Sequence, residues 1–254
     1  KVQLGVVDKA MEQALIAGEA NFNIMLAEDS LKEREWKKSL NTLAHISARI
    51  TRLEELNAKL YSAQARAYYG DGNYLNAINH YNQTLRSLYR LDTVITDPPQ
   101  KACLQYQIGD TLLNIGSVYR RKSQMLIAED YYNQAEKIFA DLDNQKAKEM
   151  LTNSLRKRAG IANYLGQANK AIELLEKGNA ISAELEITNS SVVYKNWQHL
   201  GWSYRLLGRW DDAIDLNTQA FELIQQQKPV DKWEVMKAHI YLGESYRLIR
   251  NGDL

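Results

Sequence analysis

The sequence predicts an all-α solenoid built from antiparallel helix hairpins. A small residue recurs at Ala65, Gly116, Ala159, Gly201 and Gly243, at steps of 51, 43, 42 and 42 residues. A fixed period of this size indicates that one supersecondary unit is repeated along the chain. Only 3 prolines and 13 glycines occur in 254 residues, which leaves little room for strands and turns. The repeated unit is therefore expected to be helical.

The unit at residues 194–227 shows the pattern most clearly. Its first helix places one stripe of residues on a single face, at offsets 0, 3, 4 and 7: Trp197, Leu200, Gly201 and Tyr204. Gly208 follows as a turn residue that can take a positive φ. A second helix then carries Ala213. Because Gly201 and Ala213 lack large side chains, the two helices of the hairpin are expected to approach closely.

The other units repeat these marks. The small residue of the second helix is found again at Ala77, Ala128 and Ala171. We therefore expect units at about residues 58–91, 109–142, 152–185 and 194–227, with a half unit at 236–254. The long first step contains an insertion, in which Asp97 can cap the next helix and Pro98 or Pro99 can start it.

Residues 1–57 carry less of the pattern and are expected to form an N-terminal helical hairpin, either a divergent repeat or a cap, before the array at 58–254. Residues 7–27 and 31–56 are helix-like, and the segment at 28–30 between them offers a turn. The chain begins without Met and ends after half a unit. We therefore expect it to be a fragment of a larger protein.

The combined pattern resembles that of tetratricopeptide repeats (TPR), W-x2-L-G-x2-Y…A-x3-F…P, over about residues 58–249. The resemblance implies a right-handed α-solenoid, the TPR-like superhelix. The period of about 42 departs from the usual 34, and the closing proline is missing in every unit. Long repeats of this style look like those of bacterial STAND-type signalling ATPases and transcription regulators.

The resemblance also implies a binding surface, because the first helices of such arrays line the concave side. At the 25 positions that usually face this groove, nine residues are Lys or Arg and two are acidic, where the chain average predicts about three of each sign. The residues expected to bind a partner are Lys59, Arg66, Tyr69, Arg120, Arg121, Arg156, Asn163, Tyr164, Lys195, Trp202, Arg205, Lys237 and Arg247. Arginine holds carboxylates through paired hydrogen bonds, so the expected partner is an acidic or carboxylate-bearing protein segment.

A structural alternative stays open for the same cations. Arg120, Arg205 and Arg247 each follow the Tyr of the motif, and they could pair with acidic residues of a neighbouring unit. Exposed pairs of this sort contribute about 0–1 kcal/mol each. In that case the arginines would form a charge ladder with no role in binding.

Composition limits the other classes of function. The formal charge of +1 gives no whole-chain attraction to nucleic acid or to an anionic membrane, and no apolar run approaches the length of about 20 residues that spans a bilayer. Cys103 is the only cysteine, which excludes an internal disulfide and favours a reducing, cytoplasmic location. We expect its thiol to be packed in the structure.

Catalytic and metal-binding patterns are absent from the sequence. The four histidines, His45, His80, His199 and His239, show no ligand spacing, and no phosphate-binding, zinc-protease or nucleophile-elbow motif occurs. We therefore expect no enzyme activity, no cofactor and no metal. The leading hypothesis is a scaffold for protein–protein interaction that binds a protein or peptide. The alternatives are a sensor segment of a STAND-type regulator and, more weakly, an RNA-binding helical repeat. The sequence does not indicate the oligomeric state.

Overall fold

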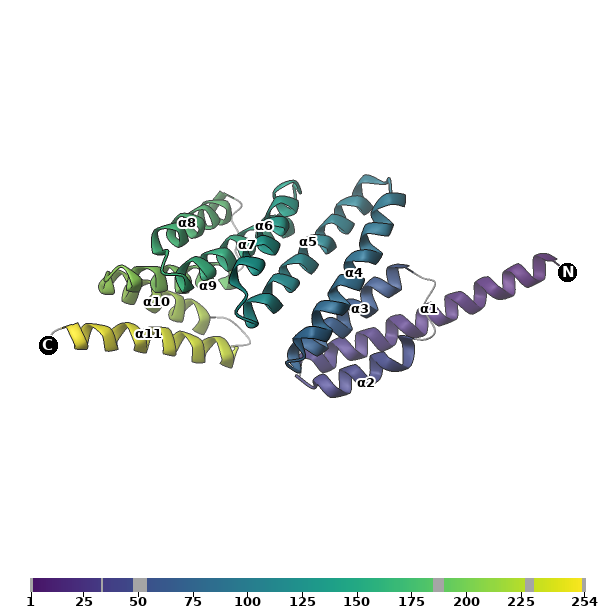
Figure 1. Cartoon of the computed structure of the whole chain (residues 1–254), viewed down its shortest axis with the longest axis horizontal. Coiled ribbons are helices and arrows are strands. Elements are labelled where there is room, and N and C mark those ends of the chain that lie inside the picture. The colour runs from purple at the N-terminus through teal and green to yellow at the C-terminus, as the bar shows by residue number, and fades with distance from the viewer. Residues whose placement is uncertain (1, 33, 48–53, 185–189, 227–230, 253–254) are drawn as a thin grey trace. The chain divides into compact units, whose positions relative to one another are not determined.

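A computed structural model describes residues 2–32, 34–47, 54–184, 190–226 and 231–252, and the ordered elements in these ranges are all helices (Figure 1). In chain order they are α1 (Val2–Lys32), α2 (Trp36–Ser47), α3 (Glu54–Gly70), α4 (Tyr74–Val94), α5 (Pro98–Arg121), α6 (Met125–Ala140), α7 (Gln145–Tyr164), α8 (Ala168–Glu184), α9 (Ser190–Leu206), α10 (Trp210–Gln225) and α11 (Lys232–Gly252).

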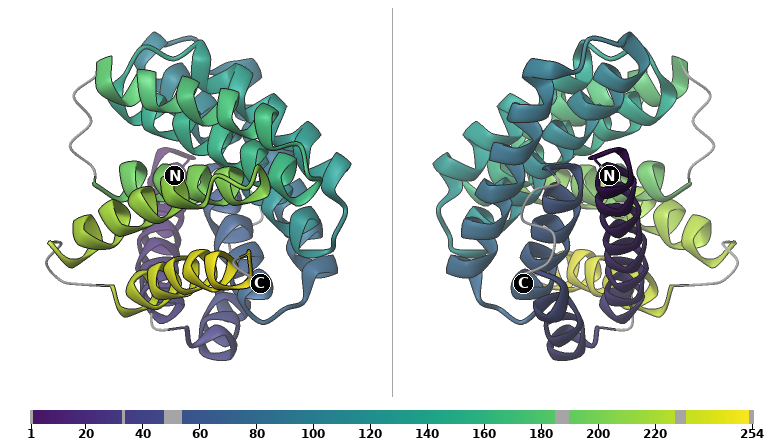
Figure 2. Two further views of the ribbon diagram at one scale, coloured as in Figure 1. Left: turned by 90° about the vertical axis from the view of Figure 1, so that its left-hand side faces the viewer. Right: turned by 90° about the vertical axis from the view of Figure 1, so that its right-hand side faces the viewer.

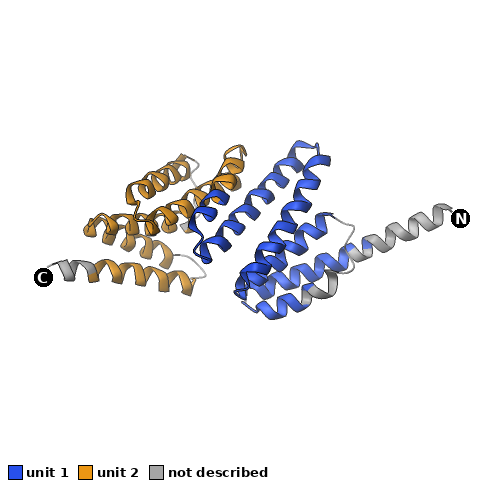
Figure 3. Cartoon of the chain, in the orientation of Figure 1, with its two compact units in different colours: residues 1–131 blue, residues 132–254 orange. Residues whose placement is uncertain are grey.

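The helices fall into two compact units, residues 1–131 and 132–254 (Figure 3). Consecutive helices lie side by side within each unit, with α3 against α4 in unit 1 and α7 against α8 and α9 against α10 in unit 2 (Figure 2). The predicted all-α class and hairpin architecture are thereby confirmed. The predicted division between residues 57 and 58 falls inside α3, which contacts α2 as well as α4.

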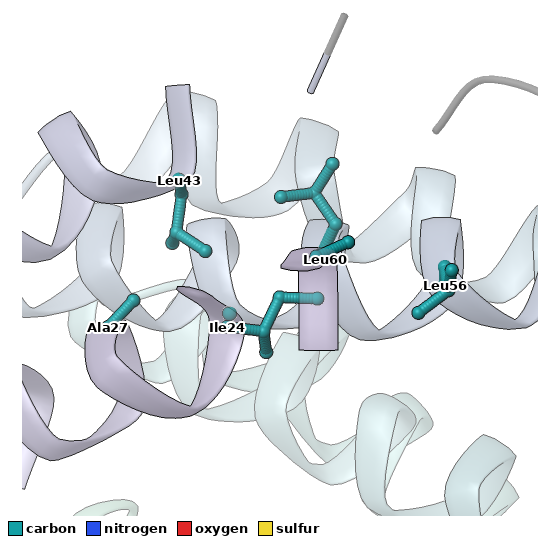
Figure 4. Close-up of a cluster of buried hydrophobic side chains, with 7 residues drawn as sticks. Ile24, Ala27, Leu43, Leu56 and Leu60 are labelled. Atoms are coloured by element: carbon teal, nitrogen blue, oxygen red, sulfur yellow. The ribbon is translucent and has the colours of Figure 1, made fainter. Parts of the chain in front are cut away.

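In unit 1, helices α1, α2 and α3 share an apolar core. It is made of Ala20, Ile24, Ala27, Leu43, Leu56, Leu60 and Ala63 (Figure 4). Asn73 caps α4 by accepting a hydrogen bond from the backbone N–H of Asn76 (3.3 Å). Asp97 caps α5 by accepting from the N–H of Gln100 (3.2 Å), with Pro98 in the first turn. The cap and start predicted from the sequence of the insertion are thus confirmed.

In unit 2, two hairpins are followed by α11, which packs on α9 and α10. Gly166 and Gly208 close the hairpin turns with φ of +73° and +72°, as the sequence predicted for Gly208. A Cβ placed on Gly201 would lie 2.9 Å from the side-chain amide of Asn217. The predicted close approach of the two helices at Gly201 is therefore confirmed for α9 and α10.

The expected turn at residues 28–30 is wrong, because α1 continues through them to Lys32. Each of the two carboxylates in that segment forms an ion pair, one within α1 and one with another helix. Asp29 pairs with Lys32 on the same helix (2.8 Å), and Glu28 pairs with Arg66 of α3. The chain turns instead at Arg34, whose φ is 62°. Residues 31–56 also form no single helix, since α2 ends at Ser47, and residues 48–53 lie outside the described ranges.

Cys103 is exposed, so the expectation of a packed thiol is wrong. It lies on α5, and its Sγ accepts a long hydrogen bond from Nε2 of Gln107, one turn further along (3.7 Å). In the part of the chain that is described, no helix combines the length and apolar character needed to cross a membrane.

Candidate functional site

In unit 1, two of the predicted groove residues of α3 line a cavity of about 150 Å³. Lys59 and Arg66 contribute to its wall together with Asp110 of α5. Both cations are already engaged: Lys59 lies 2.9 Å from Glu55, and Arg66 pairs with Glu28. This cavity therefore presents opposite charges next to each other and not a field of one sign.

Two more of the predicted residues link α3 to α5. Nε of Arg121 donates a hydrogen bond to the hydroxyl of Tyr69, at 3.3 Å. Tyr69 also packs against the ring of Tyr74, with 6.0 Å between centroids. Arg120, next to Arg121, is exposed and forms no ion pair with a described residue. Lys59 and Arg121 are exposed as well, but each has a contact to a described side chain, Glu55 and Tyr69 respectively.

In unit 2, α7 and α9 enclose a cavity of about 320 Å³ that we call the basic pocket. Its lining is Glu149, Met150, Asn153, Arg156, Lys157, Ser191, Val192 and Lys195. It brings together Arg156 and Lys195, two cations that were predicted from different repeats. Arg156 is oriented by a hydrogen bond to Asn153 and lies 3.5 Å from Nε2 of His199. Three cations thus face one carboxylate in this pocket.

The ammonium group of Lys195 lies among other charged side chains. Its ammonium lies 3.8 Å from Oε1 of Glu234, and Lys237 of α11 lies 2.7 Å from the same oxygen. Burial lowers the pKa of Lys195, the charge of Glu234 opposes this effect, and the positive charges of Arg156 and Lys237 reinforce it. One buried carboxylate is shared by two lysines, with the guanidinium of Arg156 nearby. The charge of Asp231 also acts on Lys195, so three positive and two negative charges act at this point and positive charge is in excess.

A second cavity of unit 2, which we call the tryptophan pocket, lies between α9 and α11 and has a volume of about 260 Å³. It is lined by Trp202, Arg205, Leu206, Glu244 and Arg247. Arg205 forms an ion pair with Glu244, and its side chain is only 10% exposed. Arg247 is exposed and forms no ion pair within the described ranges. The pocket thus combines an indole and a leucine with one open cation at its rim.

Three predicted residues of unit 2 line neither pocket: Lys237, which pairs with Glu234, Asn163 and Tyr164. Asn163 is 2% exposed, its Nδ2 donates to the backbone O of His199 (3.1 Å), and its Oδ1 accepts from Ser203 (2.9 Å). Its amide therefore joins α7 to α9 and is not available to a partner. Tyr164 is exposed at the end of α7.

Sequence reasoning missed Arg158, which replaces the Leu of the motif in its repeat. Arg158 forms a largely buried ion pair with Glu136 of α6, and Lys177 of α8 lies 3.3 Å from the same carboxylate. A charge at a core position of the stripe was the signal that such a partner had to exist. It also missed Lys157, whose neighbour Arg156 was the predicted position.

The structural alternative for the arginines holds for part of the set. Arg205 pairs with Glu244 across to the next repeat, as the charge-ladder hypothesis predicted. Arg66 pairs in the same way with Glu28 of an earlier helix. Arg120 and Arg247 have no such ion pair among the described residues. The groove cations therefore divide into structural and unpaired members.

No group of three or more His, Cys, Asp and Glu side chains with metal-binding geometry occurs in the ranges that the structure covers. No model of a known protein family matches the sequence, and no curated protein matches it significantly. The similarity of this chain to known proteins is therefore a similarity of three-dimensional structure.

Several solved structures share the fold. The nearly identical TPR-like repeats of a kinesin light chain from Podosopora anserina match with a TM-score of 0.58 and 19% identity, over 80% of this chain and 93% of that one. BtubC from P. vanneervenii matches with a TM-score of 0.61 and 20% identity, over 90% and 83%.

A STAND protein with a tetratricopeptide repeat sensor, from Pyrococcus horikoshii, matches with a TM-score of 0.69 and 14% identity. The match covers 97% of this chain but only 36% of that protein. At these identities the likeness concerns the fold alone. Together with the helix pairs and the motif glycines, it shows that the chain has the tetratricopeptide-repeat fold, an α-solenoid of antiparallel helix hairpins.

Proposed function

We propose that this chain is a non-catalytic scaffold that binds an acidic or carboxylate-bearing protein segment through the basic pocket of unit 2. The single observation that supports this function is that Arg156 and Lys195, predicted independently from two repeats, line one cavity. Positive charge is in excess there, and a carboxylate entering the pocket would meet donors that are already oriented.

The test is binding of a fluorescein-labelled oligoglutamate peptide, followed by fluorescence anisotropy, to the chain and to the variant Arg156→Gln with Lys195→Gln. A hydrogen bond to a charged group contributes about 1.5–3 kcal/mol, and 1.4 kcal/mol corresponds to a factor of ten. We therefore expect the double variant to bind at least about tenfold more weakly. Added salt should weaken binding to the parent more than to the variant.

A matched control removes the same amount of charge elsewhere in unit 2. Lys137 on α6 and Lys170 on α8 are exposed and line neither pocket. The variant Lys137→Gln with Lys170→Gln should bind the peptide like the parent, and the helical circular dichroism of both variants should be unchanged. Equal weakening in both variants would show that only net charge matters, and this would refute a site in the pocket.

A second candidate function is a sensor segment of a STAND-type regulator. It is favoured by the match of nearly the whole chain to the repeats of a STAND protein with a TPR sensor. In this case the array would receive a partner and shift an attached domain between two states. The full-length gene provides the test, because a nucleotide-binding domain joined to this array is expected and its absence would exclude this function.

A further inference from the structure

The basic pocket and the tryptophan pocket lie along one helix. Lys195 of α9 lines the first, and Trp202 and Leu206 of the same helix line the second. Offsets of 7 and 11 residues place all three on one side of the helix. Both pockets belong to unit 2, so α9 fixes the distance between them.

The two pockets have different chemistry. The basic pocket has three cations and one carboxylate in its lining. In the tryptophan pocket, Arg205 already has its carboxylate in Glu244, so the indole of Trp202 and the side chain of Leu206 are the unsatisfied surface. Leu206 is 45% exposed, which is apolar area that a ligand side chain can remove from water.

From this arrangement we infer that the ligand is one extended peptide that carries a carboxylate side chain and, three to five residues away, a large apolar side chain. The inference rests on the proposed function and adds the second anchor and the spacing. The carboxylate lies among Arg156, Lys157 and Lys195, and the apolar side chain packs on Trp202 and Leu206.

The spacing follows from the geometry of the helix. At a rise of 1.5 Å per residue, offsets of 7 and 11 residues correspond to about 10–16 Å along α9. An extended chain covers about 3.3–3.6 Å per residue, so it spans this distance in about three to five residues. A peptide with its two anchors much closer together or much further apart would engage one pocket at a time and would lose the gain of linking them.

The test uses labelled synthetic peptides with a Gly/Ser background, measured by anisotropy against the whole chain. One carries a Glu pair and a Leu about four residues apart, and others have the same residues about one or about eight apart. Two more carry only the Glu pair or only the Leu. We expect the matched spacing to bind about tenfold more tightly than each of the others.

Two variants locate the second anchor. Leu206→Ser should remove the advantage of the matched peptide and leave the affinity for the Glu-only peptide unchanged. Leu207→Ser is the control, because Leu207 is a similarly exposed neighbour that does not line the pocket. The control should bind every peptide like the parent.

The outcomes separate the inference from the proposed function. If all Glu-bearing peptides bind equally and Arg156→Gln with Lys195→Gln weakens them, the acidic-segment function stands and the second anchor is refuted. If the matched peptide binds tightly but Leu206→Ser changes nothing, the apolar side chain lies elsewhere and the inference is also refuted. If no Glu-bearing peptide binds, both fall together.

Discussion

Two glycines at the same place of the repeat motif should respond in opposite ways to replacement by alanine. Gly201 lies in α9, where an added Cβ would be 2.9 Å from Nδ2 and Oδ1 of Asn217. That amide is held in place, because Asn217 is 1% exposed and donates to Ser245 of α11 (3.2 Å). At Gly243 of α11, no described atom lies within 4 Å of an added Cβ.

The magnitudes follow from two opposing effects. Alanine is favoured over glycine in a helix interior by about 1 kcal/mol, and inserting a methyl group into a packed interface costs about 1–3 kcal/mol. Gly243→Ala experiences the first effect alone, so its free energy of unfolding should rise by about 1 kcal/mol. Gly201→Ala experiences both, so its free energy of unfolding should fall by roughly 0–2 kcal/mol.

The assay is urea denaturation followed by circular dichroism. The difference between the two variants isolates the steric cost, about 1–3 kcal/mol, because the helix propensity cancels. Adding Asn217→Ala to Gly201→Ala should remove most of that cost, since the atoms that the Cβ meets are gone. Equal stability changes in the two single variants, to within about 0.5 kcal/mol, would refute the close approach of α9 and α10 as the reason for the small residue.

Three further predictions concern charge, exposure and ionisation. Arg205→Glu places a second carboxylate next to Glu244 and should lower the free energy of unfolding by about 1–3 kcal/mol, less than for a fully buried pair because Glu244 is half-exposed. Adding Glu244→Arg should recover most of this loss in urea melts. An unchanged midpoint in the single variant would contradict the ion pair. Cys103 should react with a thiol reagent in the folded chain nearly as fast as in urea, whereas a much slower folded-state reaction would show a packed thiol. Burial, and then the charge of Glu234, raises the pKa of Tyr194 from 10.0 to about 12. The contribution of this tyrosine to stability is therefore present below pH 10 and is lost as the pH rises toward 12. Tyr194→Phe should lose less stability over this range, and identical pH profiles of the variant and the parent would contradict the shift.

The basic pocket shows how far the sequence leads toward a site. The repeat positions of Arg156 and Lys195 predicted that each residue lies on the side of its helix expected to face a ligand, and in the structure both line one cavity. The position of Asn163 in the motif also predicted contact with a ligand. Its amide instead forms hydrogen bonds that join α7 to α9. A position in a repeat predicts the side of a helix. It does not predict whether a neighbouring helix already uses the side chain.

Arg205 and Arg247 make the same point with charge. They occupy one motif position in successive repeats, and the sequence treats them alike. In the structure Arg205 is nearly buried against Glu244, whereas Arg247 is exposed at the rim of the same pocket. Arg205 meets a carboxylate of α11, 39 residues further along the chain, whereas no described residue forms an ion pair with Arg247.

The sequence by itself determined the repeated helix hairpins, the turn at Gly208 and the place where α9 and α10 touch, but not the turn between α1 and α2. These features depend on short-range effects: the 3.6-residue period, caps such as Asp97, the positive φ of Gly208 and the missing side chain of Gly201. The tertiary structure alone decided which cations are paired, which amides are buried and which residues share a pocket. Those properties depend on groups roughly 40 residues apart in the chain, as are Arg156 and Lys195, and are set by distance and by loss of water, which no local pattern encodes.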